Sequence, residues 1–422
     1  MSNQVKPISV AVIGGGQAGL SASYYLQRKG IDHLVFEQET SMHAWKSQRW
    51  DAFCLVTPNW QCQLPGHPYE GSDPDGFMTK NEIVDYLEAF REKVAAPLRE
   101  QVTVSKVKPL EQGGFEIVTS DGVYTADQVV VTSGGYREPI VPRVAERIPE
   151  TIRQLHSEQY RNAGQLPEGG VLVVGSGQSG AQIAEDIHLA GRKVHLAVGD
   201  APRCARFYRG RDVVTWLADM GYYDMPVDAH PLKEGVRDNT NHYVTGRDGG
   251  RDIDLRRFAL EGMKLYGALE GFEQGVVTFD DRLEARLDEA DKTYNGINAA
   301  IDHYIAEKGL MAPPPSVYEP VWKPEDAGTA LDLAAAGVTS IIWCIGFRPD
   351  FGWLDAPVFN GRGQPVHRRG VTRVPGIYFL GLPWLHTWGS GRFSGVARDA
   401  EYIADRIERA LGDAQAAKMV AQ

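Results

Sequence analysis

A glycine-rich turn near the start of the chain recurs in its middle, and this repeat constrains the fold more than any other feature. The first copy, residues 12–19, reads VIGGGQAG, and the second, residues 173–180, reads VVGSGQSG. Both have the spacing G-x-G-x-x-G, and each follows a short apolar run rich in β-branched residues, which is typical of a buried parallel strand. The repeat therefore predicts two strand–turn–helix units of the same kind.

In such a turn each glycine has its own role. The first permits a tight turn, the second lets the backbone approach a pyrophosphate, and the third lets the helix pack closely on its strand. The pyrophosphate then lies at the helix N-terminus, where free N–H groups and the helix dipole favour an anion. Gly30 and Gly191 are expected to end the two helices. We therefore expect two bound dinucleotides and electron transfer between them, with these cofactor-binding residues: Gly14, Gly16, Gln17, Ala18, Gly19, Gly175, Gly177, Gln178, Ser179 and Gly180.

The residues after each unit predict which dinucleotide it binds. The strand 33–36 ends at Glu37, which is placed to accept hydrogen bonds from a ribose diol, whereas Val198 stands at the matching position of the second unit. Arg203 and Arg206 follow there, with two more arginines, in a chain of net charge −11. The simplest assignment is FAD at the first turn and NADPH, through its 2′-phosphate, at the second. Asp200 lies close enough to this site that NADH is an alternative to NADPH. The alternative for the arginines is that they form a solvated loop.

Composition excludes several classes of protein. The chain has 422 residues, 43% hydrophobic and 23% charged, which is ordinary for a globular protein with two domains. The acidic balance argues against nucleic acid or an anionic membrane as partner. The four cysteines have neither zinc nor disulfide-framework spacing, so no metal is expected. No apolar run of about 18 residues is present, and the expected location is cytoplasmic.

The predicted fold class is α/β, with two Rossmann-like domains, the second inserted into the first. Two apolar strands that end in a small-residue turn, near Gly134 and near Gly346, are expected to close the two domains, and Gly134 is also a predicted cofactor-binding residue. The predicted boundaries are 1–163 for the first part of the FAD domain, 164–350 for the NAD(P)H domain and 351–422 for the rest of the FAD domain. Within the inserted domain, helices are expected at 255–269 and 283–308, with a strand at 276–279. This insertion either caps the active site or has a purely structural role.

Several segments together resemble class B flavoprotein monooxygenases, the flavin-containing monooxygenase group that includes plant YUCCA-type enzymes, over almost the whole chain. The most specific is Trp45-Lys46-(x2)-Arg49-Trp50-Asp51, continued by 57–65 and Pro68-Tyr69. Residues 77–87 resemble the family helix that follows. The signature F-x-G-x-x-x-H-x-x-x-[WY] is only half present: His156 and Tyr160 fit, whereas Glu150 and Ile152 replace the Phe and Gly.

The resemblance implies that NADPH reduces FAD, and that the reduced flavin adds O2 to form a C4a-(hydro)peroxide that oxygenates a small organic substrate. Asn59 is the expected hydrogen-bond donor to the flavin or peroxide, the alternative being an Asx-turn after Pro58. Trp45 is expected to wall the flavin ring, and Trp388, with Trp384 and His386, to line the substrate pocket. The turn 389–395 precedes a helix at 396–411 whose N-terminus would face the flavin pyrimidine; its predicted cofactor-binding residues are Arg392, Phe393 and Ser394.

Three other functions share these nucleotide-binding motifs. An NAD(P)H-dependent flavoprotein reductase would pass electrons to a quinone or a protein partner without oxygenating anything. A disulfide reductase needs two cysteines at C-x2-C or C-x4-C spacing, which Cys54 and Cys62 do not have. A non-catalytic dinucleotide sensor would bind cofactor without turnover. The sequence does not indicate the substrate or the type of oxygenation, and a homodimer is the default expectation for the oligomeric state.

Overall fold

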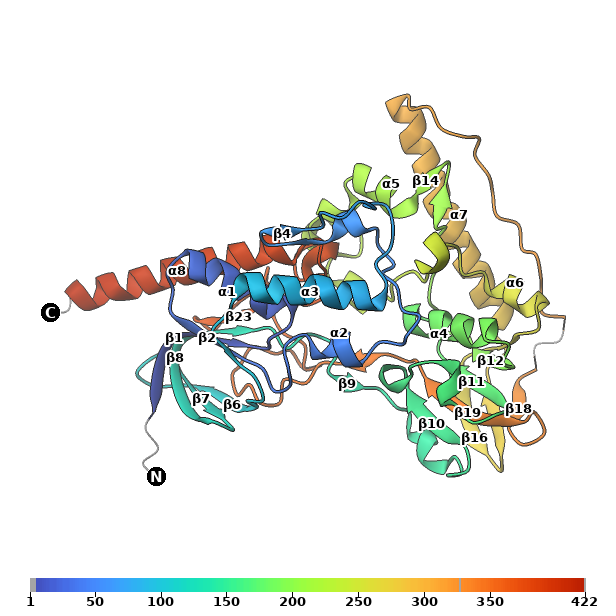
Figure 1. The fold of residues 1–422 in the computed structure, drawn as a ribbon, viewed down its shortest axis with the longest axis horizontal. Coiled ribbons are helices and arrows are strands. Elements are labelled where there is room, and N and C mark those ends of the chain that lie inside the picture. The colour runs from blue at the N-terminus through green and yellow to red at the C-terminus, as the bar shows by residue number, and fades with distance from the viewer. Residues whose placement is uncertain (1–4, 326–327, 421–422) are drawn as a thin grey trace.

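The computed structural model describes residues 5–325 and 328–420, and two sheets form its frame, one mixed and one parallel (Figure 1). The first sheet has the order β21-β22-β23-β8-β1-β2-β5, and β7 and β6 extend it from β8. β1, β2, β5, β8 and β23 run parallel, as expected for the strands of a dinucleotide-binding domain. The strands of this sheet are β1 (Lys6–Ile13), β2 (His33–Phe36), β5 (Leu98–Arg99), β6 (Val104–Pro109), β7 (Phe115–Thr119), β8 (Gly122–Val131), β21 (His367–Arg368), β22 (Val371–Thr372) and β23 (Ile377–Phe379).

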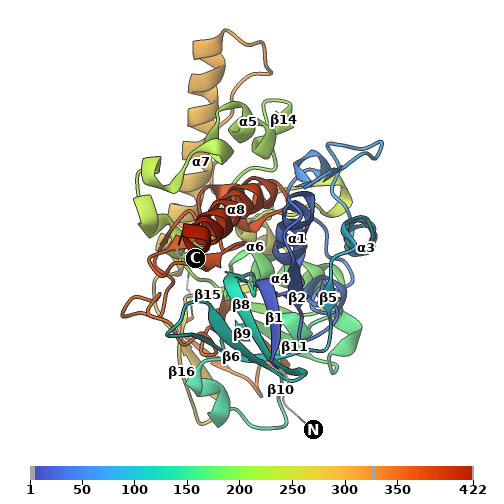
Figure 2. The ribbon, with the colours of Figure 1, turned by 90° about the vertical axis from the view of Figure 1, so that its left-hand side faces the viewer.

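Successive residues of β1 face opposite sides of the sheet, and both sides are covered. Val10 and Val12 belong to a core with the three helices α1 (Gln17–Arg28), α3 (Lys80–Val94) and α8 (Val396–Val420). Ala11 and Ile13 belong to a second core with the β6–β7–β8 meander. Figure 2 shows the three helices together on one side of this sheet. Burial on both faces explains why the strand reads as a continuous apolar run.

The second sheet repeats this plan in the order β10-β19-β11-β12-β15, with every pair parallel. Helix α4 (Gln178–Leu189) covers one face, and a three-stranded antiparallel sheet, β16-β17-β18, covers the other. Two Rossmann-like units in one chain are therefore confirmed. The strands are β10 (Arg153–His156), β11 (Gly170–Val174), β12 (Val194–Ala197), β15 (Lys264–Tyr266), β16 (Leu269–Glu273), β17 (Val276–Phe279), β18 (Ala330–Asp332) and β19 (Val338–Trp343).

The second sheet lies between β8 and β23 of the first sheet along the chain, so the domain that contains it is inserted. Its first strand, β10, precedes residue 163, so the second sheet begins upstream of the predicted boundary. Two short connecting strands, β9 (Glu138–Pro139) and β20 (Phe347–Arg348), pair antiparallel. The outgoing and returning connections between the domains therefore run side by side.

The insertion within the second domain differs from the prediction in one helix. The expected helix at 255–269 ends early: α6 spans only Leu255–Leu260, and the chain then enters β15 and β16. Gly262 stands at φ +106° in that turn, which favours glycine and stops the helix. The helix expected at 283–308 is present as α7 (Leu283–Lys308), and β17 occupies the strand expected at 276–279.

The remaining elements of the insertion are short. β13 (Phe207–Tyr208) and β14 (Arg211–Asp212) form a hairpin that leads into α5 (Val213–Asp219). We call residues 221–242 the cover segment, because this run of 3₁₀ turns reaches the C-terminal part of the first domain. There the N–H of Val227 donates to the carbonyl of His386 at 2.7 Å, and Arg398 pairs with Asp224 at 2.6 Å.

Three short elements lie between β2 and α3 along the chain: α2 (His43–Ser47), β3 (Gln63–Leu64) and β4 (His67–Pro68). Across 5–325 and 328–420, no helix is long and apolar enough to cross a membrane.

Candidate active site

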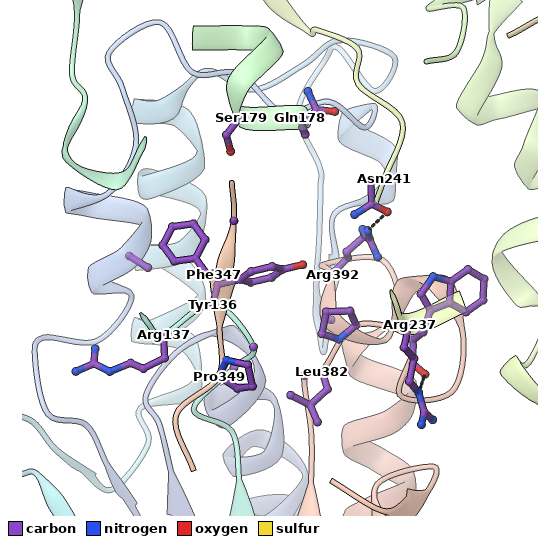
Figure 3. A pocket seen from close by; sticks show the side chains of 18 of the residues that line it. Tyr136, Arg137, Gln178, Ser179, Arg237, Asn241, Phe347, Pro349, Leu382 and Arg392 are labelled. Carbon is purple, nitrogen blue, oxygen red and sulfur yellow. Dashed lines mark hydrogen bonds between the residues drawn. The ribbon is translucent and has the colours of Figure 1, made fainter. Parts of the chain in front are cut away.

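One cavity of about 1980 Å³ joins the two glycine turns. Its wall includes Gly14, Gly16, Gln17 and Ala18 from the first turn and Gly175, Gly177, Gln178 and Ser179 from the second. Figure 3 shows Gln178 and Ser179 on one side of this pocket, Leu382 on the other, and Tyr136 and Phe347 between them. The structure therefore places the two predicted dinucleotide sites on one continuous space.

The first and third glycines of each turn have the structural roles that their spacing predicts. Gly14 has φ +117°, and a Cβ there would lie 2.6 Å from the carbonyl oxygen of Thr132. Gly175 has φ +100° and the same relation to Cys344. A Cβ on Gly19 would lie 1.9 Å from the oxygen of Gly14, and the matching distance from Gly180 to Gly175 is also 1.9 Å. The first and third glycines are thus required by the protein itself.

The middle glycines are different, because nothing in the protein requires them. Gly16 has φ −80° and ψ −171°, and Gly177 has φ −63° and ψ −176°, backbone angles that any residue adopts. A Cβ on Gly16 would meet no atom within 4 Å, and one on Gly177 would meet only Thr240, at 3.6 Å. Both positions face the cavity. Glycine here leaves room for a group outside the protein, so the turns fit a bound pyrophosphate.

Another residue of this wall also fits a bound ligand. Ser133 lines the cavity beside Gly14, and its buried hydroxyl has no hydrogen-bond partner within the described residues. Gly134 follows at φ +78° and lines the same wall. Sequence reasoning singled out Gly134 and missed Ser133, which the small-residue turn after β8 could have indicated.

The acidic residues after the two units differ in their surroundings. Glu37 lies at the cavity wall, where it accepts hydrogen bonds from the N–H groups of Gly15 at 2.7 Å and Glu39 at 2.9 Å. Asp200 also lines the cavity, and its 77%-exposed side chain accepts from Arg286 at 2.8 Å. Each unit therefore has a carboxylate shortly after its second strand, one residue after β2 for Glu37 and three residues after β12 for Asp200.

The prediction that Arg203 and Arg206 bind a 2′-phosphate is wrong. Arg203 is 3% exposed, pairs with Asp254 and Asp291 at 3.2 Å each, and packs under the ring of Tyr318. Neither arginine lines the cavity, since buried carboxylates hold both of them.

Arg206 is 1% exposed, pairs with Asp212 at 2.6 Å and donates to the carbonyl of Val56 at 2.7 Å. Arg209 and Arg211 likewise pair with Asp302 and Asp219. The basic cluster of the sequence is therefore part of the framework of the insertion, which also excludes the alternative of a solvated loop for Arg203 and Arg206.

The prediction for Asn59 is also wrong, because its amide holds a loop together. Its Nδ2 donates to the carbonyl of Asp73 at 2.9 Å, and its Oδ1 accepts from the N–H of Met78 at 2.7 Å. The side chain is 4% exposed and does not line the cavity. Asn59 is thus a structural residue of the segment that supports α3.

The two tryptophans predicted at the site both line the cavity. The indole N–H of Trp45 donates to the side chain of Gln17 at 2.9 Å, and its ring lies 5.1 Å from that of Phe393. This links the first helix N-terminus to the turn that opens α8. Trp388 lies at the other end, with its ring 4.4 Å from that of Tyr223 and 3.8 Å from the guanidinium of Arg392.

The turn before α8 separates its three predicted residues. Arg392 lines the cavity, whereas Phe393 is 7% exposed and belongs to the core of the first domain. The hydroxyl of Ser394 is buried without a hydrogen-bond partner within the described residues. Ser394, like Phe393, does not line the cavity.

The two residues that match the F-x-G-x-x-x-H-x-x-x-[WY] signature, His156 and Tyr160, make hydrogen bonds within the protein. The Nε2 atom of His156 lies 3.1 Å from the carbonyl oxygen of Gly346, and burial lowers the pKa of this histidine. The hydroxyl of Tyr160 donates to Asp186 at 2.7 Å. His156, at the end of β10, thus contacts the returning connection between the domains, and Tyr160 is bonded to α4.

Arg49 is a site residue whose motif was noted but whose role was not predicted. It lines the cavity against Trp45, with its guanidinium 4.9 Å from the ring centre, and burial lowers its pKa to about 10. No group of three or more His, Cys, Asp or Glu that could hold a metal occurs among the described residues.

These features define a class: an oxidoreductase with two dinucleotide-type domains that face one cavity. A family model described as pyridine nucleotide-disulphide oxidoreductase matches residues 11–218. A CzcO-like oxidoreductase of Geobacillus kaustophilus (strain HTA426) is 31% identical over 406 residues, which cover 95% of this chain and 98% of that protein. The CzcO oxidoreductase of Bacillus subtilis (strain 168) is 30% identical over 401 residues, covering 94% and 98%. The chain therefore belongs to the family of CzcO-like oxidoreductases.

More distant similarities agree with the class expected from the sequence. The probable indole-3-pyruvate monooxygenase YUCCA4 of Arabidopsis thaliana is 26% identical over 189 residues, covering 44% of this chain and 46% of that protein. A flavin-containing monooxygenase from Stenotrophomonas maltophilia has the same fold, with a TM-score of 0.65, 20% identity and coverage of 96% and 99%. The resemblance to class B flavoprotein monooxygenases and the prediction of a flavin-dependent oxidoreductase are thus confirmed.

A disulfide reductase also shares this fold. The bacillithiol disulfide reductase from Staphylococcus aureus has a TM-score of 0.60 at 14% identity, covering 95% of this chain and 98% of that one. In this chain, however, Cys62 is 1% exposed, and burial raises the pKa of its thiol to about 12. A thiol of this kind is not the reactive thiolate that disulfide exchange needs.

Proposed function

We propose that this protein is a monooxygenase that uses FAD, a nicotinamide dinucleotide and O2 to oxygenate a small organic substrate. The nicotinamide dinucleotide is NADPH or NADH. The single observation that supports this proposal is the one cavity lined by both glycine turns, since it would bring the two cofactors together. Flavin supplies the redox and oxygen chemistry when it is bound, and the protein contributes binding, orientation and exclusion of water.

The first turn is the proposed FAD site. The N–H groups that open α1, at Gln17 and Ala18, would meet the FAD pyrophosphate, with Gly16 leaving the necessary space. Glu37 would accept a hydrogen bond from the ribose diol. Its two contacts with Gly15 and Glu39 fix the carboxylate in place for this role.

The proposed flavin-ring end lies between Trp45 and the start of α8. Trp45 is held by Gln17 and would wall the ring. The N-terminus of α8, after Ser394, would place its positive dipole end toward the flavin pyrimidine and stabilise negative charge there. Gly134 also lines the cavity, and a Cβ there would meet no atom within 4 Å.

The second turn is the proposed site of the nicotinamide dinucleotide. The N–H groups of Gln178 and Ser179 open α4 and would meet its pyrophosphate. The side chain of Gln178 donates to the carbonyl of Val244 at 2.6 Å, so the insertion fixes this side of the site. A cytoplasmic location and a possible homodimer stay predictions.

The test separates the monooxygenase from a flavoprotein reductase. The purified protein is expected to be yellow and to be reduced anaerobically by NADPH or NADH. Rapid mixing with O2 should then give a transient absorbance band of the C4a-(hydro)peroxyflavin that the resemblance implies, distinct from the bands of oxidised and reduced flavin. Immediate reoxidation without such a band would favour the reductase, and a protein without flavin after reconstitution with FAD would refute both.

A further inference from the structure

Arg392 carries a positive charge inside the cavity without a carboxylate partner within the described residues. Its guanidinium donates to Oδ1 of Asn241 at 2.9 Å and to the carbonyl of Trp388, both neutral acceptors. Two other arginines of the same wall are neutralised, Arg237 by Glu234 at 3.3 Å and Arg362 by Asp238 at 3.4 Å. Arg392 is thus distinct from the paired arginines of the cavity.

Two further cavity arginines lack an ion pair within the described residues, but their surroundings differ. Arg137 is exposed, so water solvates its charge. Arg49 lies with its guanidinium 4.9 Å from the ring centre of Trp45, at the proposed flavin end of the cavity. Burial lowers the pKa of Arg392, while the phenols of Tyr136, Tyr223 and Tyr222 act in the opposite direction. Because a guanidinium stays charged in proteins, this cation lacks a counter-ion.

Aromatic side chains surround this guanidinium. Trp388 stacks on it, and the ring of Tyr223 lies 4.4 Å from that of Trp388. Tyr222 and His230 approach Trp384 at 6.2 and 5.1 Å. The tyrosines and the histidine come from the cover segment and the tryptophans from the loop before α8, so the two domains build this wall together. Planar aromatic side chains of this kind favour packing against an aromatic ring of a ligand.

The side chain of Arg392 also connects the two domains. Its backbone belongs to the turn that opens α8, whereas its guanidinium reaches Asn241 of the cover segment (Figure 3). Two of its N–H groups are used by Asn241 and Trp388, which leaves three of the five donors of a guanidinium free. A carboxylate takes two parallel N–H groups from such a side chain.

We propose that this part of the cavity binds a small aromatic carboxylic acid, with its carboxylate on Arg392 and its ring against Trp388 and Tyr223. The inference rests on the proposed function, in that the bound acid would be the molecule that is oxygenated. It names the chemical class of the substrate, a ring joined to an anionic group.

Calorimetry on the purified protein tests the inference, because it measures binding whether or not oxygenation occurs. The probes are benzoate, phenylacetate and 3-phenylpropionate, each paired with its neutral amide. At least one acid should bind at least tenfold more tightly than its amide. Arg392→Met should abolish this preference and leave the weaker affinity for the amide within about threefold, and Arg392→Lys should restore part of it.

Arg362→Gln is the matched control, since it removes a cavity arginine that Asp238 already neutralises, and it should keep the preference. Equal binding of acid and amide by the unaltered protein, or no binding of any acid, would overturn the inference. So would a preference that survives in Arg392→Met, an equal loss of acid and amide, or an acid affinity that disappears when NAD⁺ or NADP⁺ saturates the protein. Failure of the proposed function would instead appear as missing flavin or immediate reoxidation.

Discussion

The two glycine turns have the same backbone conformation, but they differ in how the acidic residue at each proposed ribose site is held. In both, the first and third glycines are fixed by contacts of the protein, and the middle one faces the cavity. At the first turn Glu37 is held by two backbone N–H groups, so its carboxylate belongs to the turn itself. At the second turn the acid is Asp200, an exposed side chain held by Arg286 from α7.

This difference indicates which part of each site is local and which depends on the insertion. The pyrophosphate and ribose part of the first site is assembled from residues of one strand–turn–helix–strand unit, and Glu37 is held by the backbone of that unit. The second site receives Arg286 from α7 and Val244 from the loop before α6. Changes in the insertion are therefore expected to alter the use of the nicotinamide dinucleotide more than the binding of FAD.

The largest expected effect comes from Gly16→Val. Because a Cβ at this position meets no protein atom within 4 Å, the chain should fold, but the side chain would occupy the space of the FAD pyrophosphate. We expect a colourless protein with an unchanged circular dichroism spectrum. Gly19→Val is the contrasting variant: its Cβ would lie 1.9 Å from the oxygen of Gly14, so we expect it to misfold. A folded Gly16→Val protein that remains yellow would show that flavin does not bind at this turn.

The matching change at the second turn should have a different result. Gly177→Val places its Cβ beside Thr240 only, at 3.6 Å, so the protein should fold and stay yellow. Misplacing the nicotinamide should lower kcat/KM for its reductive half-reaction by about a hundredfold or more. Stopped-flow reduction measures this, with dithionite as the control reductant that should act normally. Loss of flavin from this variant would contradict the assignment of the two turns.

The next prediction concerns Arg206, which pairs with Asp212 and does not bind the 2′-phosphate as predicted. Arg206→Met leaves the buried carboxylate of Asp212 unpaired, which should reduce the free energy of unfolding by about 3 kcal/mol or more. The ratio of the Michaelis constants for NADPH and NADH should stay the same, because Arg206 does not line the cavity. Arg206→Met combined with Asp212→Asn should recover part of the stability in chemical denaturation. A changed coenzyme ratio at normal stability would restore the 2′-phosphate role.

Local patterns predicted the two turns, their helices and the acid Glu37, because each depends on residues a short distance apart in the chain. The errors share one cause, which is contact between distant segments. Arg203 is neutralised by Asp254 and Asp291, and Asn59 is held by Asp73 and Met78. No periodicity or spacing indicates such pairs. The contact of Arg392 with Asn241 of the cover segment could not be predicted from the sequence for the same reason.

The smallest expected effect concerns the choice of coenzyme at Asp200. Its carboxylate would accept a hydrogen bond from the ribose diol of NADH and repel the 2′-phosphate of NADPH. Asp200→Asn removes this repulsion, while Asp280 still holds Arg286 near the site. We expect kcat/KM for NADPH to rise relative to that for NADH by about tenfold, which corresponds to about 1.4 kcal/mol.

Steady-state kinetics with both coenzymes measures this ratio. Asp238→Asn is the matched control, because it removes an acid of the same cavity wall that pairs with Arg362, and it should leave the ratio unchanged. Asp200, which Arg286 of α7 holds rather than the backbone of its own turn, would then determine which nicotinamide coenzyme this protein uses. If the ratio shifts equally in both variants, only the overall charge of the cavity matters, and Asp200 has no specific contact with the ribose.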